Sequence, residues 1–436
     1  MKLKSILGVT CAATVMFASC SNEDNPNEFI KGDKDAHLNI AVAFPKVETR
    51  SVVDGNATTD ELKVTNVTVF IFENGAAASG SGQTFTADKF DATTENLYTL
   101  KEENKILTTN GTKNIYVGIN LPTSMQSFTT ESALAKAIAV SASDLQGANG
   151  SAMFSTKVEK RLLEAVEAGG STPQKNIVAV EVERLVAKVA VSHGSTTSYT
   201  KDNVTYTIDK FAVGQDGSEM YPMKVVNSGK LITPYKRNGA PTTLFNINAN
   251  NTASNGLVGA YAIENATEKG TSGEATYAVV RASFKPAKLH ELDGTTIKEV
   301  AYALNSDNNI WVVRYEGDVY FAATETIADA ICANLSTLNP TLKATKEEYK
   351  GSYCYYYVYL NKDDAGKKLE LHRNDFIHIS IDGVNGLGTS GDTATNGETP
   401  VDPANPNEPV VKTATSLIVS ITTKAWNYST KAVTLE

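Results

Sequence analysis

The chain has 436 residues, which is long enough for two or three domains with sizeable hydrophobic cores. Its composition, 41% hydrophobic and 20% charged, excludes a polytopic membrane protein and a wholly disordered chain. The net charge is −9 and no block of five like charges occurs, so the cationic surface that nucleic-acid binding requires is not evident and nucleic acid is not an expected partner.

The first residues predict an export signal. Two lysines precede an apolar run over residues 6–18, which has the length of a signal-peptide core and is too short to span a bilayer permanently. The run ends in Phe17-Ala18-Ser19-Cys20, which resembles a bacterial lipobox, where the cysteine is acylated and becomes the new N-terminus. We therefore expect residues 1–19 to be a lipoprotein signal peptide and Cys20 to carry the lipid. The alternative is an ordinary cleaved signal with an incidental cysteine.

A polar, turn-rich tether is expected at residues 21–27, and the first strand is expected after it. Between His37 and Phe44 the sequence alternates, with Leu38, Ile40, Val42 and Phe44 on one side. Alternation of this kind predicts a β-strand with one strongly apolar face.

The rest of the chain is rich in strand patterns and poor in helix patterns. The expected helices are 131–145, 158–168 and 326–338, each with apolar residues at mixed spacings of three and four. The class is therefore mainly β with a few short helices, and the strand content favours two sandwiches in tandem. Further strands, enriched in β-branched and aromatic residues, are expected at 64–72, 115–121, 177–191, 206–211, 277–284, 310–315, 353–360, 376–381 and 417–421.

Motifs that carry enzyme chemistry are missing from the sequence. It contains no G-x-S-x-G, no H-E-x-x-H, no P-loop and no G-x-G-x-x-G on a strand-to-helix turn. His372 and His378 flank a strand, but no third ligand is near them, so two surface histidines are favoured over a metal site. We expect no catalytic residue, no metal and no cofactor, and hence a protein that is not an enzyme.

Two further groups of residues leave alternatives open. Cys332 and Cys354 are 22 residues apart, a separation that neither requires nor forbids a disulfide. The tyrosine-rich run 353–359 would turn alternate residues to opposite sides of a strand, so at least one side is expected in the core, and a structural role is favoured over a sugar-facing one.

Several segments follow one another in a characteristic order along the chain. Together they resemble the fimbrillins, the type V pilins of Bacteroidales, and the resemblance extends over essentially the whole chain. Their order and spacing are more specific than any single motif. The segments are the lipobox, the apolar strand, residues 47–51, 182–191, 277–286, 349–356, 373–379 and 386–388, and Trp426 near the C-terminus.

The resemblance implies how the chain is matured. In this family an arginine-specific protease cuts after an arginine such as Arg50, so that Ser51 becomes the new N-terminus. It also implies two tandem transthyretin-like β-sandwich domains. The implied organisation is a propeptide with the displaced strand at 20–50, an N-terminal sandwich at 51–192, a C-terminal sandwich with a flexible arm at 193–412, and a donor-strand region at 413–436.

The sequence pattern makes strand exchange physically sensible. Cutting at Arg50 severs the apolar strand from the body, and its departure leaves a hydrophobic groove and an unpaired sheet edge that invite a replacement strand. The Gly- and Pro-rich segment 384–412 predicts an arm that carries the replacement. The expected donor residues are Val433 and Leu435, with Leu417, Val419 and Ile421 either supporting them or pairing within their own subunit.

The expected function is that of a fimbrial shaft subunit that supports adhesion and biofilm formation at the cell surface. Its expected partners are further copies of itself in a head-to-tail polymer, other fimbrial subunits, the arginine-specific protease and, for the lipidated precursor, the outer membrane. The alternatives are a fimbrial tip or anchor subunit, and a surface glycan-binding lipoprotein. Such a binder is expected to expose tryptophan platforms, and the chain has only Trp311 and Trp426. Asp392-Thr393-Ala394 resembles an O-glycosylation acceptor, with an ordinary loop as the alternative.

Overall fold

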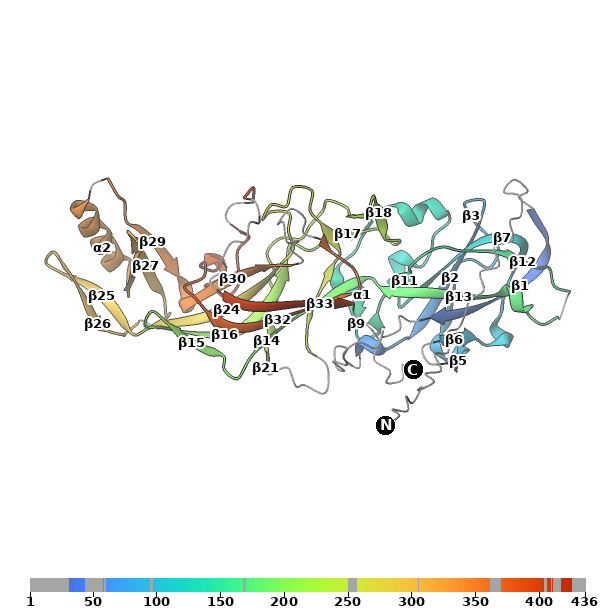
Figure 1. Cartoon of the computed structure of the whole chain (residues 1–436), viewed down its shortest axis with the longest axis horizontal. Helices are drawn as coiled ribbons and strands as arrows, with labels where there is room; N and C mark the ends of the chain where they lie inside the picture. The colour runs from blue at the N-terminus through green and yellow to red at the C-terminus, as the bar shows by residue number, and fades with distance from the viewer. Residues whose placement is uncertain are drawn as a thin grey trace, which may run out of the picture.

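The computed structural model describes residues 31–43, 58, 60–94, 97–167, 170–249, 257–304, 306–339, 341–360, 370–403, 406–408, 410 and 417–425. Figure 1 shows an elongated molecule with the first strands at one end and an α/β excursion from the second half of the chain at the other. Strands dominate the described residues, so the prediction of a mainly-β fold is confirmed. Among the described residues, no helix has the length and apolar character needed to cross a membrane.

The N-terminal body is built around one strand that takes part in two layers. The strand β1 pairs antiparallel with β7 through its first half, and with β13 and β6 through its second half. The strands of this body are β1 (Lys31–Ala43), β2 (Asn66–Glu73), β3 (Ala76–Ala77), β4 (Gln83–Thr86), β5 (Phe90–Thr94), β6 (Leu97–Leu100), β7 (Ile106–Ile119), β11 (Met153–Ser155), β12 (Glu159–Leu163) and β13 (Ile177–Arg184). Their order is β3-β2-β7-β11-β13-β1-β6-β5, with β4 on β2 and β12 on β7.

A long extended segment connects the two bodies. The strand expected at 177–191 is observed as β13 followed by β14 (Val186–His193), with the fully buried Leu185 between them. β13 pairs in the N-terminal body, whereas β14 pairs with strands of the C-terminal body. The chain thus passes from one body to the other at Leu185. The boundary predicted from the sequence is a few residues later, after residue 192.

The C-terminal body consists of two sheets that enclose the largest core. One sheet has the order β21-β14-β32-β33 with β22 on β14, and the other has the order β15-β16-β24-β30 with β20 on β16. Apolar residues of both sheets, such as Val189 and Val280, are fully buried between them. The strands are β15 (Ser198–Lys201), β16 (Val204–Gly214), β20 (Phe245–Asn246), β21 (Asn248–Ala249), β22 (Ala260–Ile263), β24 (Tyr277–Pro286), β30 (Tyr353–Tyr359), β32 (Asp375–Val384) and β33 (Leu417–Ala425).

The excursion at the far end contains the longest helix of the described residues (Figure 1). α2 (Glu325–Leu338) begins after Thr324, whose side chain accepts a hydrogen bond from the Ile327 amide, and it buries Ala328, Ile331 and Leu335. The helix expected at 326–338 is therefore confirmed. α2 packs on β25 (Lys288–Asp293), β26 (Thr296–Ala301), β27 (Ile310–Tyr315), β28 (Asp318–Ala322) and β29 (Thr345–Tyr349).

The other two expected helices are wrong in whole or in large part. Residues 131–145 form a 3-10 turn at Glu131–Ala135 and a single turn of α-helix, α1 (Ala142–Leu145). The helix at 158–168 is wrong, because this segment contains β12, which pairs with β7. The apolar residues that suggested a helix do not share a buried face, since Leu162 is 56% exposed.

The remaining strands are short and pair two by two. They are β8 (Ile138–Ala139), β9 (Gln146–Gly147), β10 (Gly150–Ser151), β17 (Glu219–Met220), β18 (Val225–Asn227), β19 (Lys230–Ile232), β23 (Asn265–Ala266) and β31 (Glu370–Leu371).

Candidate functional site

The candidate site is the groove in the N-terminal body that β1 fills. Leu38 and Ile40 are completely buried and Val42 is 1% exposed, as expected for the apolar face of this strand. Phe44, the fourth expected member, lies outside the described residues. The opposite side of β1 is also covered, because His37 and Asn39 are buried too.

Backbone pairing holds β1 along both of its edges. Leu38 lies opposite Ile106 of β7, while Val42 lies opposite Val180 of β13 on one side and opposite Tyr98 of β6 on the other. The Asn176 side chain adds a 2.9 Å hydrogen bond to the carbonyl oxygen of His37. Removing β1 would therefore leave unpaired edges on its neighbours as well as an empty line of apolar pockets.

The walls of this groove are apolar side chains from several strands. They pack with β1 in one continuous hydrophobic core. Without β1 these side chains would face water, which makes the empty groove a strong acceptor for an apolar strand. The wall residues include Val69 and Ile71 of β2, Ile115 and Val117 of β7, and Val178 and Val180 of β13.

The C-terminal strand β33 is held much less firmly than β1. It pairs antiparallel with β32 at the end of its sheet, so Leu417, Val419 and Ile421 pair within their own subunit, which is one of the two arrangements expected from the sequence. Burial decreases along these alternate residues, from 2% exposed at Leu417 through the half-buried Val419 to 43% exposed at Ile421. Val433, Leu435 and Trp426 lie outside the described residues.

The segment that leads to β33 lies against the body over its described part. Tyr355 of β30 donates a 2.8 Å hydrogen bond to the Gly397 carbonyl, and Tyr357 donates to the Val401 carbonyl. Gly388 approaches β30 so closely that a Cβ would lie 2.4 Å from the Tyr355 carbonyl oxygen. The sequence predicted a flexible or semi-extended arm at 384–412. In the described residues of this segment, tyrosine hydroxyls attach the chain to the outer face of the sheet.

A buried charged cluster joins the segment after the expected cleavage point to β14. Lys188 Nζ lies 2.8 Å from Glu61 Oε1, both side chains are at most 1% exposed, and the Tyr261 hydroxyl donates to the same carboxylate. Burial lowers the pKa of Lys188 and the Glu61 carboxylate opposes this shift. Sequence reasoning missed this cluster, because its members lie far apart in the chain and no local pattern connects them.

The remaining predicted site residues divide into two groups. Cys20, Arg50 and Ser51 lie outside the described residues. Cys332 and Cys354 are free thiols, so the disulfide alternative does not apply in this structure. Within the described residues, no group of three or more metal-ligating side chains is assembled.

The comparisons with known proteins bear on the same body that holds the groove. Residues 36–207 match the family model described as the major fimbrial subunit protein FimA. The resemblance to the fimbrillins is confirmed. Among curated protein sequences no match is found.

Solved structures are similar to this chain at low sequence identity. A candidate cell adhesion protein from Parabacteroides distasonis is 13% identical, with 90% of this chain and 100% of that chain covered at a TM-score of 0.50. A fimbrillin from Porphyromonas gingivalis is 14% identical over 90% of this chain and 98% of that one, with a TM-score of 0.42. The tip fimbrial protein Mfa3 of the same organism is 12% identical over 90% and 100%, with a TM-score of 0.39.

Proposed function

We propose that the chain is a structural, non-enzymatic shaft subunit of a cell-surface fimbria that polymerises by donor-strand exchange and supports adhesion and biofilm formation. The observation that carries this proposal is the placement of β1. It is a central strand whose residues 36–42 are all buried, yet only six residues separate its end at Ala43 from Arg50. One cut there disconnects a strand that fills the core of the body.

The maturation pathway follows from the order of features in the sequence. The precursor is anchored in the outer membrane through a lipid on Cys20, and an arginine-specific protease cuts between Arg50 and Ser51. The incoming strand comes from the C-terminal region of the next subunit, with Val433 and Leu435 filling pockets that β1 has left. Leu417, Val419 and Ile421 extend the donor or brace it from their own sheet.

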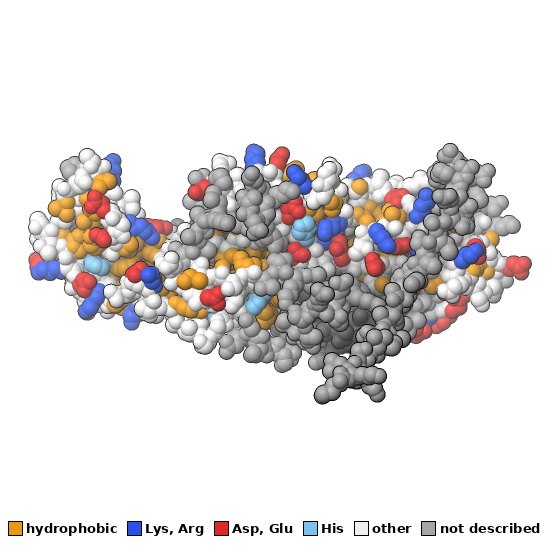
Figure 2. Space-filling model, viewed as in Figure 1, with side chains coloured by type: hydrophobic (Ala, Val, Ile, Leu, Met, Phe, Trp, Pro, Cys, Tyr) orange, Lys and Arg blue, Asp and Glu red, His pale blue; other side chains and the backbone are white. Residues whose placement is uncertain are grey.

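Strand burial, more than charge, is the driving force of assembly in this proposal. On the face seen in Figure 2, the described acidic and basic side chains are interspersed and form no field of a single sign. The groove, by contrast, offers apolar side chains from several strands to a strand that brings alternate apolar side chains. Association through the groove should therefore depend weakly on ionic strength.

Two experiments test the proposal. Sheared fimbriae should contain this chain with Ser51 at its N-terminus, whereas polymer that begins at Cys20 would indicate an anchor subunit. Deleting residues 427–436 should give a folded and cleaved monomer that cannot donate a strand. Fimbriae of normal length and number in cells whose only copy of this chain is that deletion variant would refute the donor assignment and favour a tip subunit or a surface glycan-binding lipoprotein.

A further inference from the structure

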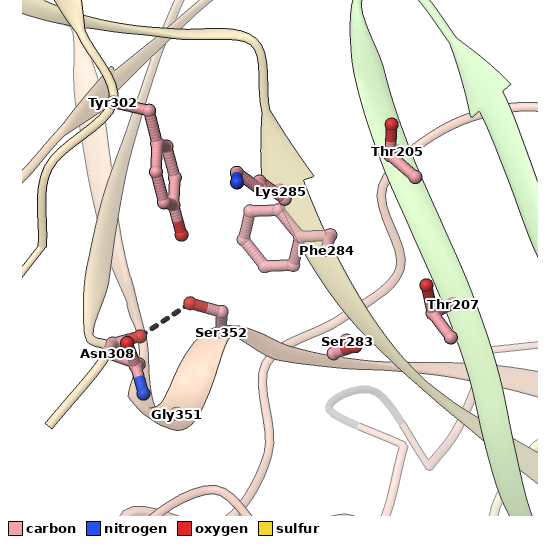
Figure 3. Close-up of a pocket in the computed structure, with 9 residues that line it drawn as sticks. All are labelled: Thr205, Thr207, Ser283, Phe284, Lys285, Tyr302, Asn308, Gly351 and Ser352. Carbon is pink, nitrogen blue, oxygen red and sulfur yellow. Dashed lines mark hydrogen bonds between the residues drawn. The ribbon is translucent and has the colours of Figure 1, made fainter.

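An open cavity of about 340 Å³ lies on the outer face of the C-terminal body, away from both strands of the exchange mechanism. Its floor is formed by β16 and β24, and its walls by the segment after β26 and the turn before β30 (Figure 3). This volume is within the range of small-molecule sites in proteins. The arm segment covers the neighbouring face of β30 and leaves this corner of the sheet open.

The hydroxyls of Thr205, Thr207 and Ser283 lie on the floor. They belong to two rows of register partners that cross the floor and continue onto the neighbouring strand β15. Ser198, Thr207 and Ser283 are register partners in one row. Thr200, Thr205 and Lys285 form the next row. Within the first row the Ser198 and Thr207 hydroxyls are 3.2 Å apart. Because each hydroxyl both donates and accepts, the floor can exchange hydrogen bonds with a ligand that carries several hydroxyls of its own.

A single cation stands in the cavity without an acidic neighbour. Lys285 Nζ lies 4.9 Å from the centre of the Tyr302 ring, which orients the ammonium group over the cavity (Figure 3). No carboxylate is among the side chains that line the cavity, and Lys285 is the one charged side chain among them. The site therefore offers one unneutralised positive charge beside a hydroxyl surface, which selects against cations and basic peptides.

The wall opposite the floor has a constrained backbone. Asn308, Gly351 and Ser352 all have a positive φ, between 53° and 60°, and the Ser352 hydroxyl donates a 2.5 Å hydrogen bond to the Asn308 carbonyl. Left-handed conformations at non-glycine residues persist only where the surroundings enforce them, and they are common at ligand-binding sites. The wall is thus preformed and does not need to reorganise around a ligand.

We propose that this cavity binds an acidic sugar residue, with its carboxylate or sulfate on Lys285 and its ring hydroxyls on Thr205, Thr207 and Ser283. The hexuronic acids, sialic acids and sulfated hexoses of glycan chains share this chemistry. The binding does not depend on cleavage or polymerisation. In a fimbria the site would recur with every subunit, so that weak individual contacts add up to firm attachment.

The test uses the purified full chain and an array of neutral, uronic-acid-containing, sialylated and sulfated oligosaccharides. We expect binding to the acidic members only, weakening as salt is raised. Lys285→Gln should reduce affinity for the best acidic oligosaccharide roughly tenfold or more, since a hydrogen bond to a charged group is lost. Lys288→Gln removes an exposed lysine of β25 that does not line the cavity, and it should leave binding unchanged.

Three outcomes would overturn the proposal: no acidic oligosaccharide binds the full chain, Lys285→Gln binds as tightly as the unchanged protein, or inorganic sulfate and phosphate bind as tightly as the sugars. Thr207→Val provides a second readout, because it keeps the shape of the side chain and removes only the hydroxyl. It should weaken the acidic sugar several-fold and leave the thermal unfolding midpoint within a few degrees. These measurements need no fimbriae, so they fail or succeed independently of the donor-strand mechanism.

Discussion

Cleavage after Arg50 alone is not expected to release β1. Leu38, Ile40 and Val42 are at most 1% exposed, and burying such side chains contributes about 1.5–3 kcal/mol each, or about 4.5–9 kcal/mol together as an upper bound. Backbone hydrogen bonding to β7, β13 and β6 adds to the free energy that keeps β1 bound. The cut peptide should therefore remain in its groove at micromolar protein concentration until a competing strand displaces it.

Shortening one buried side chain should loosen the peptide measurably. Ile40→Ala leaves a cavity in a closely packed core, and such changes cost about 2–5 kcal/mol. At about 1.4 kcal/mol per tenfold change, the peptide should bind at least roughly 25-fold more weakly. The matched control is Ile421→Ala, which makes the same truncation at a side chain that is 43% exposed on β33, and it should leave retention of the peptide unchanged.

The assay follows the peptide after proteolysis of the purified precursor. The cleaved protein is passed over a gel-filtration column, and mass spectrometry of the protein peak reports whether residues 31–50 travel with the body. Dissociation of a labelled peptide then gives the rates for both variants. Immediate loss of the peptide from the unchanged protein, or equal retention in Ile40→Ala, would refute the reasoning.

Three further outcomes are expected. Cys20→Ala should abolish palmitate incorporation and partition of the precursor into detergent. Glu61→Gln should leave Lys188 buried without its carboxylate and lower the free energy of unfolding by about 3–5 kcal/mol in urea titrations, whereas Asp60→Asn, in an exposed pair, should cost less than about 1 kcal/mol. Burial raises the pKa of Tyr357 from 10.0 to about 12, so its stabilisation is complete below pH 10 and is lost as the pH rises through 12. Denaturation series at pH 8 and above should show that Tyr357→Phe reduces this alkaline loss.

The first strand shows what an alternating sequence pattern can predict about burial and what it cannot. The pattern at Leu38, Ile40 and Val42 correctly identified a deeply buried apolar face. It gave no sign that His37 and Asn39 on the other face are buried as well, because alternation reports the polarity of each side and not the number of layers that cover it. Both faces of β1 are buried and both of its edges are paired, and these contacts come from strands distant in the sequence.

Other features depend on contacts between residues far apart in the sequence. The helix expected at 158–168 failed because pairing with β7 decided the conformation of that segment, and helical spacing in a short apolar pattern does not exclude a strand. The fixed arm depends on tyrosines such as Tyr355, which meets Gly397 only after folding. Glycine and proline content predicted a flexible or semi-extended segment, and in its described part hydroxyl donors 42 and 44 residues away in the sequence attach it to the sheet.

The position of β1 between Cys20 and Arg50 gives cleavage a second consequence in the proposed mechanism. The cut separates the lipid from the body covalently, but the lipid remains attached to the peptide that contains β1. If that peptide stays in the groove, the cleaved body remains at the membrane through the buried strand, and only strand exchange releases it. Departure from the membrane and entry into the polymer then become a single event.

This coupling can be tested in cells that make the variant without residues 427–436, which is cleaved but cannot donate a strand. Its cleaved body should partition with detergent, and adding a synthetic peptide that copies the missing tail should move it to the aqueous phase as the groove changes occupant. Combining the deletion with Ile40→Ala should release the body without any peptide, because the weakened strand no longer holds it. If the cleaved body enters the aqueous phase as soon as Arg50 is cut, β1 does not connect it to the membrane, and release must then precede assembly.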